Sequence, residues 1–147
     1  MSGRGLRLKS LADLKKKSGS SKVRLDPPLE SDIQIQVMQW ASVQRYKGRP
    51  LEYYLHHSPN GGKRNVREAC RFRSMGVKTG YPDIIMDIAR GGYHGLRIEL
   101  KRTKNEQLTE HQEERLEVLR EEGYFAVACK GFEETIDVIS RYLNLSE

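Results

Sequence analysis

The 147-residue chain lacks a long apolar run. Its longest such run falls far short of the about 20 residues that cross a bilayer, and Met1 is not followed by the charged and then apolar pattern of a secretory signal. The sequence has only two cysteines, Cys70 and Cys129, and neither has a partner at metal-site spacing. These absences predict a soluble, cytoplasmic protein without membrane contact, in which both thiols are reduced and lie in the core.

The sequence also lacks the motifs of several other classes of protein. There are no internal repeats, and Gly61-Gly62-Lys63 lacks the spaced glycine and the Ser or Thr of a phosphate-binding P-loop. No glycine-rich strand-to-helix turn marks a nucleotide-binding βαβ unit. His56 and His57 have no second histidine cluster to complete a metal centre, since His94 and His111 are isolated.

Positive charge is concentrated at the start of the chain. Residues 1–25 hold eight basic residues and one acidic residue, whereas residues 26–147 hold 18 basic and 19 acidic residues, so that the net charge of +6 comes from the first segment. We expect residues 1–28 to form a flexible basic arm and residues 29–147 to form one domain. Two interpretations of the arm stay open: a tether that seeks phosphates, and a solvated leader without a specific role.

Hydrophobic periodicity predicts an α/β fold with a mixed sheet, in the order α-β-α-β-β-α-β-α. The third and fourth strands, joined by a crossover helix, should be parallel. The expected helices are Glu30–Arg45, 64–75, Thr109–Glu122 and Phe132–Leu143, and the expected strands are Leu51–His57, Asp83–Ala89, Leu96–Lys101 and Tyr124–Cys129.

The candidate catalytic residues lie in the hairpin 83–101. Side chains alternate along a strand, so Glu99 and Lys101 share one face, about 7 Å apart at their roots. Pairing Ala89 with Leu96 would bring Asp83 near Glu99 or Lys101. Two carboxylates and an amine at one end of a sheet suit Mg²⁺ or Mn²⁺ and the hydrolysis of a phosphodiester bond. The alternative is a solvent-facing strand with a Glu–Lys pair.

Two further polar residues occupy positions that should face the interior. Gln112 interrupts the apolar stripe of its helix, which fits a capping box with Thr109, an amide that reaches the carboxylates, or both. Glu30 lies in register with Ile33 on the buried face of the first helix. The helix dipole alone explains an acid there, and an additional metal ligand is the other interpretation.

The turn that leads from the first expected strand into the second expected helix is a candidate phosphate contact. Backbone amides and side-chain charges of Asn60, Gly61, Gly62, Lys63 and Arg64 could hold a DNA phosphate, as could Lys78. A plain strand-to-helix turn explains the same residues.

The sequence as a whole resembles the VRR-NUC (virus-type replication-repair nuclease) domain of the PD-(D/E)xK nuclease superfamily. The resemblance covers about residues 30–143. It rests on ESDIQ (30–34), HHSPNGGKRN (56–65), GYPDIIM (80–86), GLRIELK (95–101), LTEHQ (108–112) and EEGY (121–124).

The resemblance implies a restriction-endonuclease-like core that cleaves DNA with Mg²⁺ or Mn²⁺. Asp83, Glu99 and the Leu100 carbonyl look like metal ligands, with Glu30 as a further one, and Lys101 looks like the residue that positions the attacking water. Gln112 looks like the active-site glutamine of the family.

Stand-alone members of this length resemble phage-encoded nucleases, which would place the chain in the host cytoplasm, and the core is similar to that of Holliday-junction resolvases. We therefore expect a homodimer that cuts branched DNA, a four-way junction or a flap. A less selective nickase or exonuclease, and a non-catalytic nucleic-acid-binding protein on the same fold, remain as alternatives.

Overall fold

The computed structural model describes residues 26–59 and 65–147, so the predicted basic arm (1–25) and the turn Asn60–Arg64 lie outside the described residues. The helices are α2 (Glu30–Val43), α3 (Val66–Ser74), α4 (Glu110–Glu121) and α5 (Gly131–Leu143), with a 3-10 turn η2 (Leu51–Tyr54). The strands are β1 (Arg45–Tyr46), β2 (Arg49–Pro50), β3 (Leu55–His57), β4 (Ile84–Met86), β5 (Leu96–Lys101) and β6 (Phe125–Lys130).

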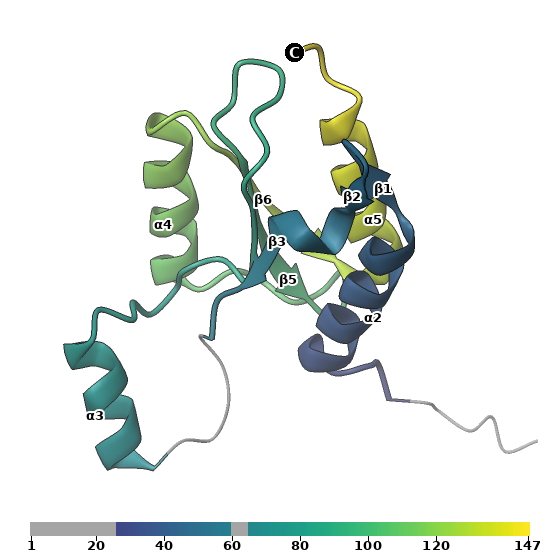
Figure 1. Cartoon of the computed structure of the whole chain (residues 1–147). Coiled ribbons are helices and arrows are strands. Elements are labelled where there is room, and N and C mark those ends of the chain that lie inside the picture. Colours follow the sequence, from purple (N-terminus) through teal and green to yellow (C-terminus); the bar gives the residue numbers. More distant parts are fainter. Residues whose placement is uncertain (1–25, 60–64) are drawn as a thin grey trace, which may run out of the picture.

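A four-stranded mixed sheet organises the fold. Its order is β3-β4-β5-β6, with β5 and β6 parallel and the other neighbours antiparallel. Helix α4 covers one face of the sheet, and α2 and α5 lie together on the other (Figure 1). The predicted α/β class, the mixed sheet and the parallel crossover pair are confirmed. No helix in the described ranges is long and apolar enough to cross a membrane.

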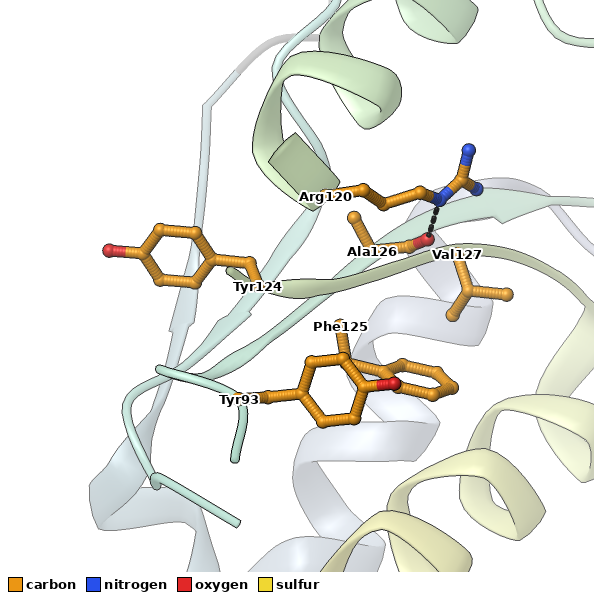
Figure 2. Close-up of a pocket in the computed structure, with 6 residues that line it drawn as sticks. All are labelled: Tyr93, Arg120, Tyr124, Phe125, Ala126 and Val127. Carbon is orange, nitrogen blue, oxygen red and sulfur yellow. Dashed lines mark hydrogen bonds between the residues drawn. The ribbon is translucent and has the colours of Figure 1, made fainter. Parts of the chain in front are cut away.

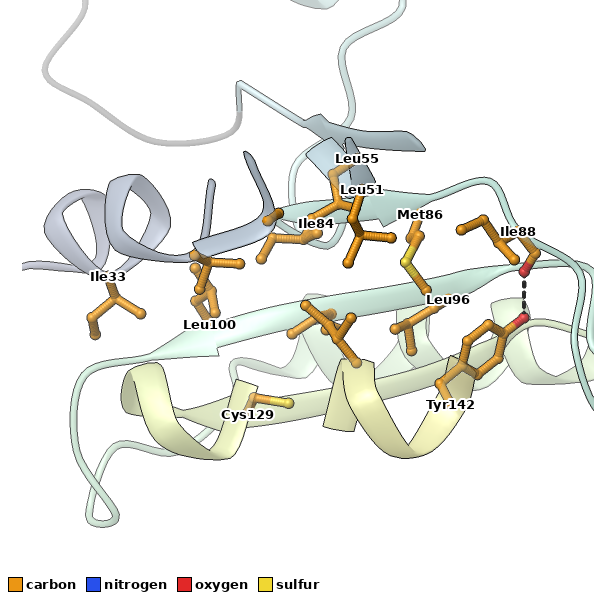
Figure 3. Packing of buried hydrophobic residues seen from close by; sticks show 14 residues of the cluster. Ile33, Leu51, Leu55, Ile84, Met86, Ile88, Leu96, Leu100, Cys129 and Tyr142 are labelled. Atoms are coloured by element: carbon orange, nitrogen blue, oxygen red, sulfur yellow. Dashed lines mark hydrogen bonds between the residues drawn. The ribbon is translucent and has the colours of Figure 1, made fainter. Parts of the chain in front are cut away.

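The main core lies between the sheet and the α2–α5 layer. Ile33 of α2, Leu100 of β5 and Cys129 of β6 are 0–1 % exposed there (Figure 3). Tyr142 of α5 is buried too, and its hydroxyl donates a 2.7 Å hydrogen bond to the Ile88 carbonyl. A smaller cluster under α4 packs on the opposite face. Strand β5 is therefore covered on both faces, and all six of its residues are buried.

Strand β4 is shorter than the predicted strand Asp83–Ala89, and the predicted pairing of Ala89 with Leu96 is wrong. Leu96 pairs with Met86 instead. The β4 ladder ends at Met86. The next amide, that of Asp87, still donates to the Tyr54 carbonyl of η2 at 3.1 Å. The chain then reverses at a tight turn, where Gly91 and Gly92 have φ of 58° and 81°, the region that glycine adopts without strain.

Two other expectations are corrected. The first half of the predicted strand Leu51–His57 is the turn η2, which brings Leu51 and Leu55 into the same core, at 1 % and 7 % exposure. Four residues of extended chain would hold these side chains farther apart. The predicted core position of Cys70 is also wrong, because it lies exposed on α3, whereas Cys129 is buried as expected.

Candidate active site

The ends of β4 and β5 bring the two predicted carboxylates together. Ile84 pairs with Ile98, so the next residues, Asp83 and Glu99, lie opposite one another. Asp83 Oδ2 accepts a 2.8 Å hydrogen bond from the Leu100 amide, which holds its carboxylate against the end of β5. Glu99 is 3 % exposed on the face that α4 covers.

Lys101 joins the same cluster. Its Nζ donates to Glu99 Oε1 at 3.2 Å and lies 3.9 Å from Glu30 Oε1 of α2. The lysine is 7 % exposed, so the interpretation of a solvent-facing Glu–Lys pair is wrong. The cluster holds three acids and one lysine, which leaves the buried end of the sheet with excess negative charge.

Gln112 makes both of the contacts predicted as alternatives. Thr109 and Gln112 form a reciprocal capping box, with 3.3 Å from the Gln112 amide to Thr109 Oγ1 and 2.9 Å from the Thr109 amide to Gln112 Oε1. The Gln112 Nε2 group donates to Glu99 Oε1. Because one end of the amide is fixed by the cap, the other end is held toward the carboxylate.

Arg97 shares the face of Glu99 and Lys101 but belongs to a different environment. Its guanidinium donates to the Leu96 carbonyl at 3.0 Å and lies 3.4 Å from Asp87 Oδ1. The Tyr124 ring centroid lies 4.3 Å from the guanidinium carbon, a cation–π distance. Arg97 therefore secures the long hairpin at the far end of β5 and takes no part in the carboxylate cluster.

The residues that hold the start of α2 beside the cluster were not predicted. Arg102 donates to the Pro28 and Pro27 carbonyls at 3.1 and 3.0 Å, and its own amide donates to Glu106 Oε2 at 2.8 Å. This link carries the N-terminal turn of α2, and with it Glu30, to the end of β5. A basic residue directly after Lys101 was the available signal, but its partners lie 74 and 75 residues away.

Burial and the repulsion between neighbouring carboxylates raise the pKa values of the acids in the cluster. Burial, reinforced by the nearby Asp83 charge, raises the pKa of Glu99 from 4.5 to about 7, against the opposing effect of Lys101. Burial also raises the pKa of Asp83, which the hydrogen bond from Leu100 partly offsets. Burial likewise raises the pKa of Glu30. Such groups are stabilised when a cation approaches.

The donor set fits a hard divalent cation. Both oxygen-donor side chains, Asp83 and Glu99, lie at one end of the sheet, and Mg²⁺ commonly uses one or two carboxylates together with water and phosphate oxygens. The Leu100 carbonyl points to the same side of β5 as its amide, which faces Asp83. Within residues 26–59 and 65–147, no three His, Cys, Asp or Glu side chains form a metal-holding group, so a site here would rest on two carboxylates.

One hollow of the described surface lies away from the cluster. It has a volume of about 320 Å³, borders the outer edge of β6 and is lined by aromatic and aliphatic side chains with one arginine (Figure 2); its residues are Tyr93, Arg120, Tyr124, Phe125, Ala126 and Val127. Arg120 Nε donates to the Ala126 carbonyl at 2.8 Å. The hollow holds no carboxylate and does not include the cluster, so it offers no chemistry of its own.

The predicted DNA contacts remain predictions. Asn60–Arg64 lie outside the described residues. Lys78 is exposed on the segment that leads from α3 back to Asp83. The structure thus brings together Asp83, Glu99, Lys101, Gln112 and Glu30, with the Leu100 backbone beside them, whereas Lys78 forms no ion pair with the described residues of this cluster.

Comparisons with known proteins identify the family of the chain. The VRR-NUC domain family matches residues 29–133. The chain belongs to this nuclease family. A solved structure described as a VRR_NUC domain protein has a TM-score of 0.76 and 50 % sequence identity, over 84 % of this chain and 94 % of its own. No curated protein matches the chain. The fold and the family predicted from the motifs are therefore confirmed.

Proposed function

We propose that this VRR-NUC protein is a divalent-metal-dependent DNA endonuclease that hydrolyses phosphodiester bonds at branched DNA. The observation that carries the proposal is the cluster at the end of β5. Asp83 and Glu99 are held side by side there, with the Lys101 amine 3.2 Å from Glu99. A fold does not require three acids around one lysine at the end of a strand, with Glu99 only 3 % exposed, whereas such a set suits a metal-assisted hydrolase.

Each side chain has a defined task in this proposal. Asp83, Glu99 and the Leu100 carbonyl would bind Mg²⁺ or Mn²⁺. Glu30 Oε1 lies 3.9 Å from Lys101 Nζ, and Glu30 would become a further ligand only if its side chain turned toward the two carboxylates. When bound, the ion acidifies a water molecule and stabilises negative charge on the phosphate. Lys101 holds the attacking water, or a phosphate oxygen, through its ammonium group.

Gln112 acts in this proposal by orienting the Glu99 carboxylate. Its Nε2 donates to Glu99 Oε1, so it orients the carboxylate and leaves the second oxygen of Glu99 available for a cation. Outer partners of this kind fix the direction in which a ligand points. The capping box with Thr109 fixes Gln112 in turn.

Selectivity for branched DNA would follow from a homodimer. A four-way junction has two-fold symmetry, and two coordinated cuts require two sites. The outer edge of β6 supports this part of the proposal, because it ends the described sheet and borders an apolar hollow. An edge strand can pair with a second copy. Sedimentation as a monomer at micromolar concentration would rule the dimer out.

The decisive assay compares the wild type with Asp83→Asn on a labelled four-way junction, a flap and a plain duplex, with Mg²⁺, Mn²⁺ or EDTA. We expect paired cuts at the junction that need the metal and disappear in the variant. The control is Asp137→Asn, because Asp137 lies exposed on α5 in an ion pair with Arg141.

The other outcomes decide between the alternatives. Equal cleavage of all three substrates would leave a metal-dependent nuclease without branch selectivity, a nickase or an exonuclease. Tight binding without cleavage by the wild type would leave a non-catalytic DNA-binding protein and would refute the proposed chemistry.

A further inference from the structure

The segment between β3 and β4 leaves the body of the protein and returns to it beside the carboxylate cluster. On the outgoing side, the Ser58 amide donates to the Asp83 carbonyl at 2.9 Å, and His57 Nδ1 lies 3.1 Å from the same oxygen. On the returning side, a Cβ at Gly80 would lie 2.8 Å from the His111 carbonyl oxygen, one residue before Gln112. The two ends of the segment thus contact the backbone of Asp83 and of His111, the residue before Gln112.

Helix α3 lies on this segment and stands away from the sheet and from the other helices (Figure 1). None of its nine side chains is buried. Val66 and Met75, near its two ends, are 80 % and 69 % exposed. An isolated helix of this length is marginal in water, and α3 adds nothing to either hydrophobic cluster, so packing does not explain its sequence.

What α3 presents is positive charge. Residues 65–82 contain four basic residues and one acidic residue, a net +3, whereas residues 26–147 as a whole carry −1. Arg67 and Arg71 are four positions apart and share one side of the helix. At 3.6 residues per turn, that side faces away from Ala69 and Phe72, which are the partly covered residues of α3.

These arginines have no partner in the part of the chain that the structure describes: no ion pair or side-chain hydrogen bond holds the Arg67 or Arg71 guanidinium. Elsewhere in the described ranges, Arg90, Arg97, Arg102 and Arg141 are each in an ion pair. Guanidinium groups of this kind match phosphate oxygens in charge and geometry.

We propose that Arg67 and Arg71 of α3 bind the phosphate backbone of the substrate duplex beside the scissile bond, so that the segment 65–82 acts as a DNA-gripping arm. This inference deepens the proposed nuclease function. The segment ends next to Asp83, so a duplex held by α3 would lie near the carboxylates. The contacts are to phosphates and therefore position the duplex without reading its sequence.

The test uses the full-length Asp83→Asn protein, which binds without cutting, and a fluorescein-labelled duplex whose anisotropy is measured from 50 to 300 mM salt. Arg67→Ala/Arg71→Ala should weaken binding about tenfold or more and lower the slope of log K against log salt by about 1.8, at about 0.9 per phosphate. Its melting temperature should equal that of the parent, because α3 buries no side chain.

The matched control removes the same charge at the other end of the molecule. Arg45→Ala/Arg141→Ala changes two arginines that are exposed near the C-terminal ends of α2 and α5, and it should leave affinity and slope unchanged. A second readout needs no substitution: Cys70 is exposed on α3 and Cys129 is buried. Duplex DNA should slow the reaction of Cys70 with a thiol reagent.

Equal affinity and salt slope in the arm variant and the control would overturn the inference, as would Cys70 reactivity that DNA leaves unchanged. A change in sedimentation without a change in DNA binding would make α3 a contact between copies and would also overturn it. Arm-dependent binding by a wild type that never cleaves would refute only the nuclease proposal. Cleavage by the wild type together with undiminished DNA binding by Arg67→Ala/Arg71→Ala would refute only the proposed role of α3.

Discussion

Charged side chains lie on the same buried face of β5 at both of its ends, but the charges that surround them differ. At one end, Arg97 is balanced by Asp87, backbone carbonyls and the Tyr124 ring. At the other, Lys101 faces Glu99, Glu30 and Asp83, one cation among three acids. Buried charges that serve the fold are compensated. The under-compensated end is the one at which an additional cation would be stabilised.

Exchanging the two basic residues for methionine tests this contrast and should give the largest effects. Lys101→Met should lower the single-turnover cleavage rate more than about a hundredfold, the range that follows loss of a donor that stabilises charge in the transition state. Arg97→Met should cost about 1–3 kcal/mol of stability, because buried carbonyls lose their donor, and should leave the rate of the folded protein unchanged.

Denaturant unfolding and single-turnover kinetics on the same preparations separate the two effects. A large loss of rate in Arg97→Met without loss of stability would mean that both ends of β5 serve catalysis. An unchanged rate in Lys101→Met would remove the lysine from the proposed chemistry.

A smaller effect should divide the two roles of Gln112. Gln112→Ala removes the capping box and the contact with Glu99, so we expect a loss of about 1 kcal/mol in stability and a 10–100-fold loss in rate, as when an outer partner of a metal ligand is removed. Thr109→Ala removes only the cap and should match the stability loss while keeping most of the rate. Parallel losses of rate in the two variants would reduce Gln112 to a helix cap.

The last test is the pH dependence of stability in the metal-free protein. Glu99 has a folded pKa of about 7 against an ordinary 4.5, so between these values the folded state binds the additional proton. Stability should therefore fall as pH rises through this window, with the loss complete above pH 7. The raised pKa values of Asp83 and Glu30 act in the same direction.

Thermal melts in EDTA at pH 5 and pH 8 measure this, at about 2–4 °C per kcal/mol for a chain of this size. Glu99→Gln should lessen the fall, whereas Glu117→Gln, at an exposed position on α4, should not. An equal fall in all three proteins would place its cause outside the cluster.

Local pattern was enough to predict most elements and their neighbours. The apolar stripes gave α4 and α5 within a residue or two of their observed ends. The hairpin brought Asp83 to Glu99 even though the predicted pairing of Ala89 with Leu96 was wrong. The expected proximity of Asp83 and Glu99 holds in spite of this error. In an antiparallel hairpin the start of β4 lies beside the C-terminal end of β5, and a shift of a few residues in register does not change that.

What sequence could not supply depended on distant partners. Strand β4 ends at Met86, where the Arg97 guanidinium lies 3.4 Å from the Met86 carbonyl and Tyr54 accepts from the Asp87 amide. The position of Glu30 depends on Arg102 reaching Pro27 and Pro28. The burial of Glu99 and Lys101 was open as well, because alternation indicates one covered face, whereas a strand between two helical layers is covered on both.

Metal binding measured without any substrate tests the central claim most directly. The account predicts that Mn²⁺ or Mg²⁺ raises the melting temperature of the wild type in a concentration-dependent way. At 100 times the dissociation constant the gain in the free energy of unfolding should be about 2.7 kcal/mol. Asp83→Asn and Glu99→Gln should lose that response, and Glu117→Gln should keep it. A wild type that does not respond to either ion, or a response that all variants share, would contradict the assignment of the β5 cluster as a metal site.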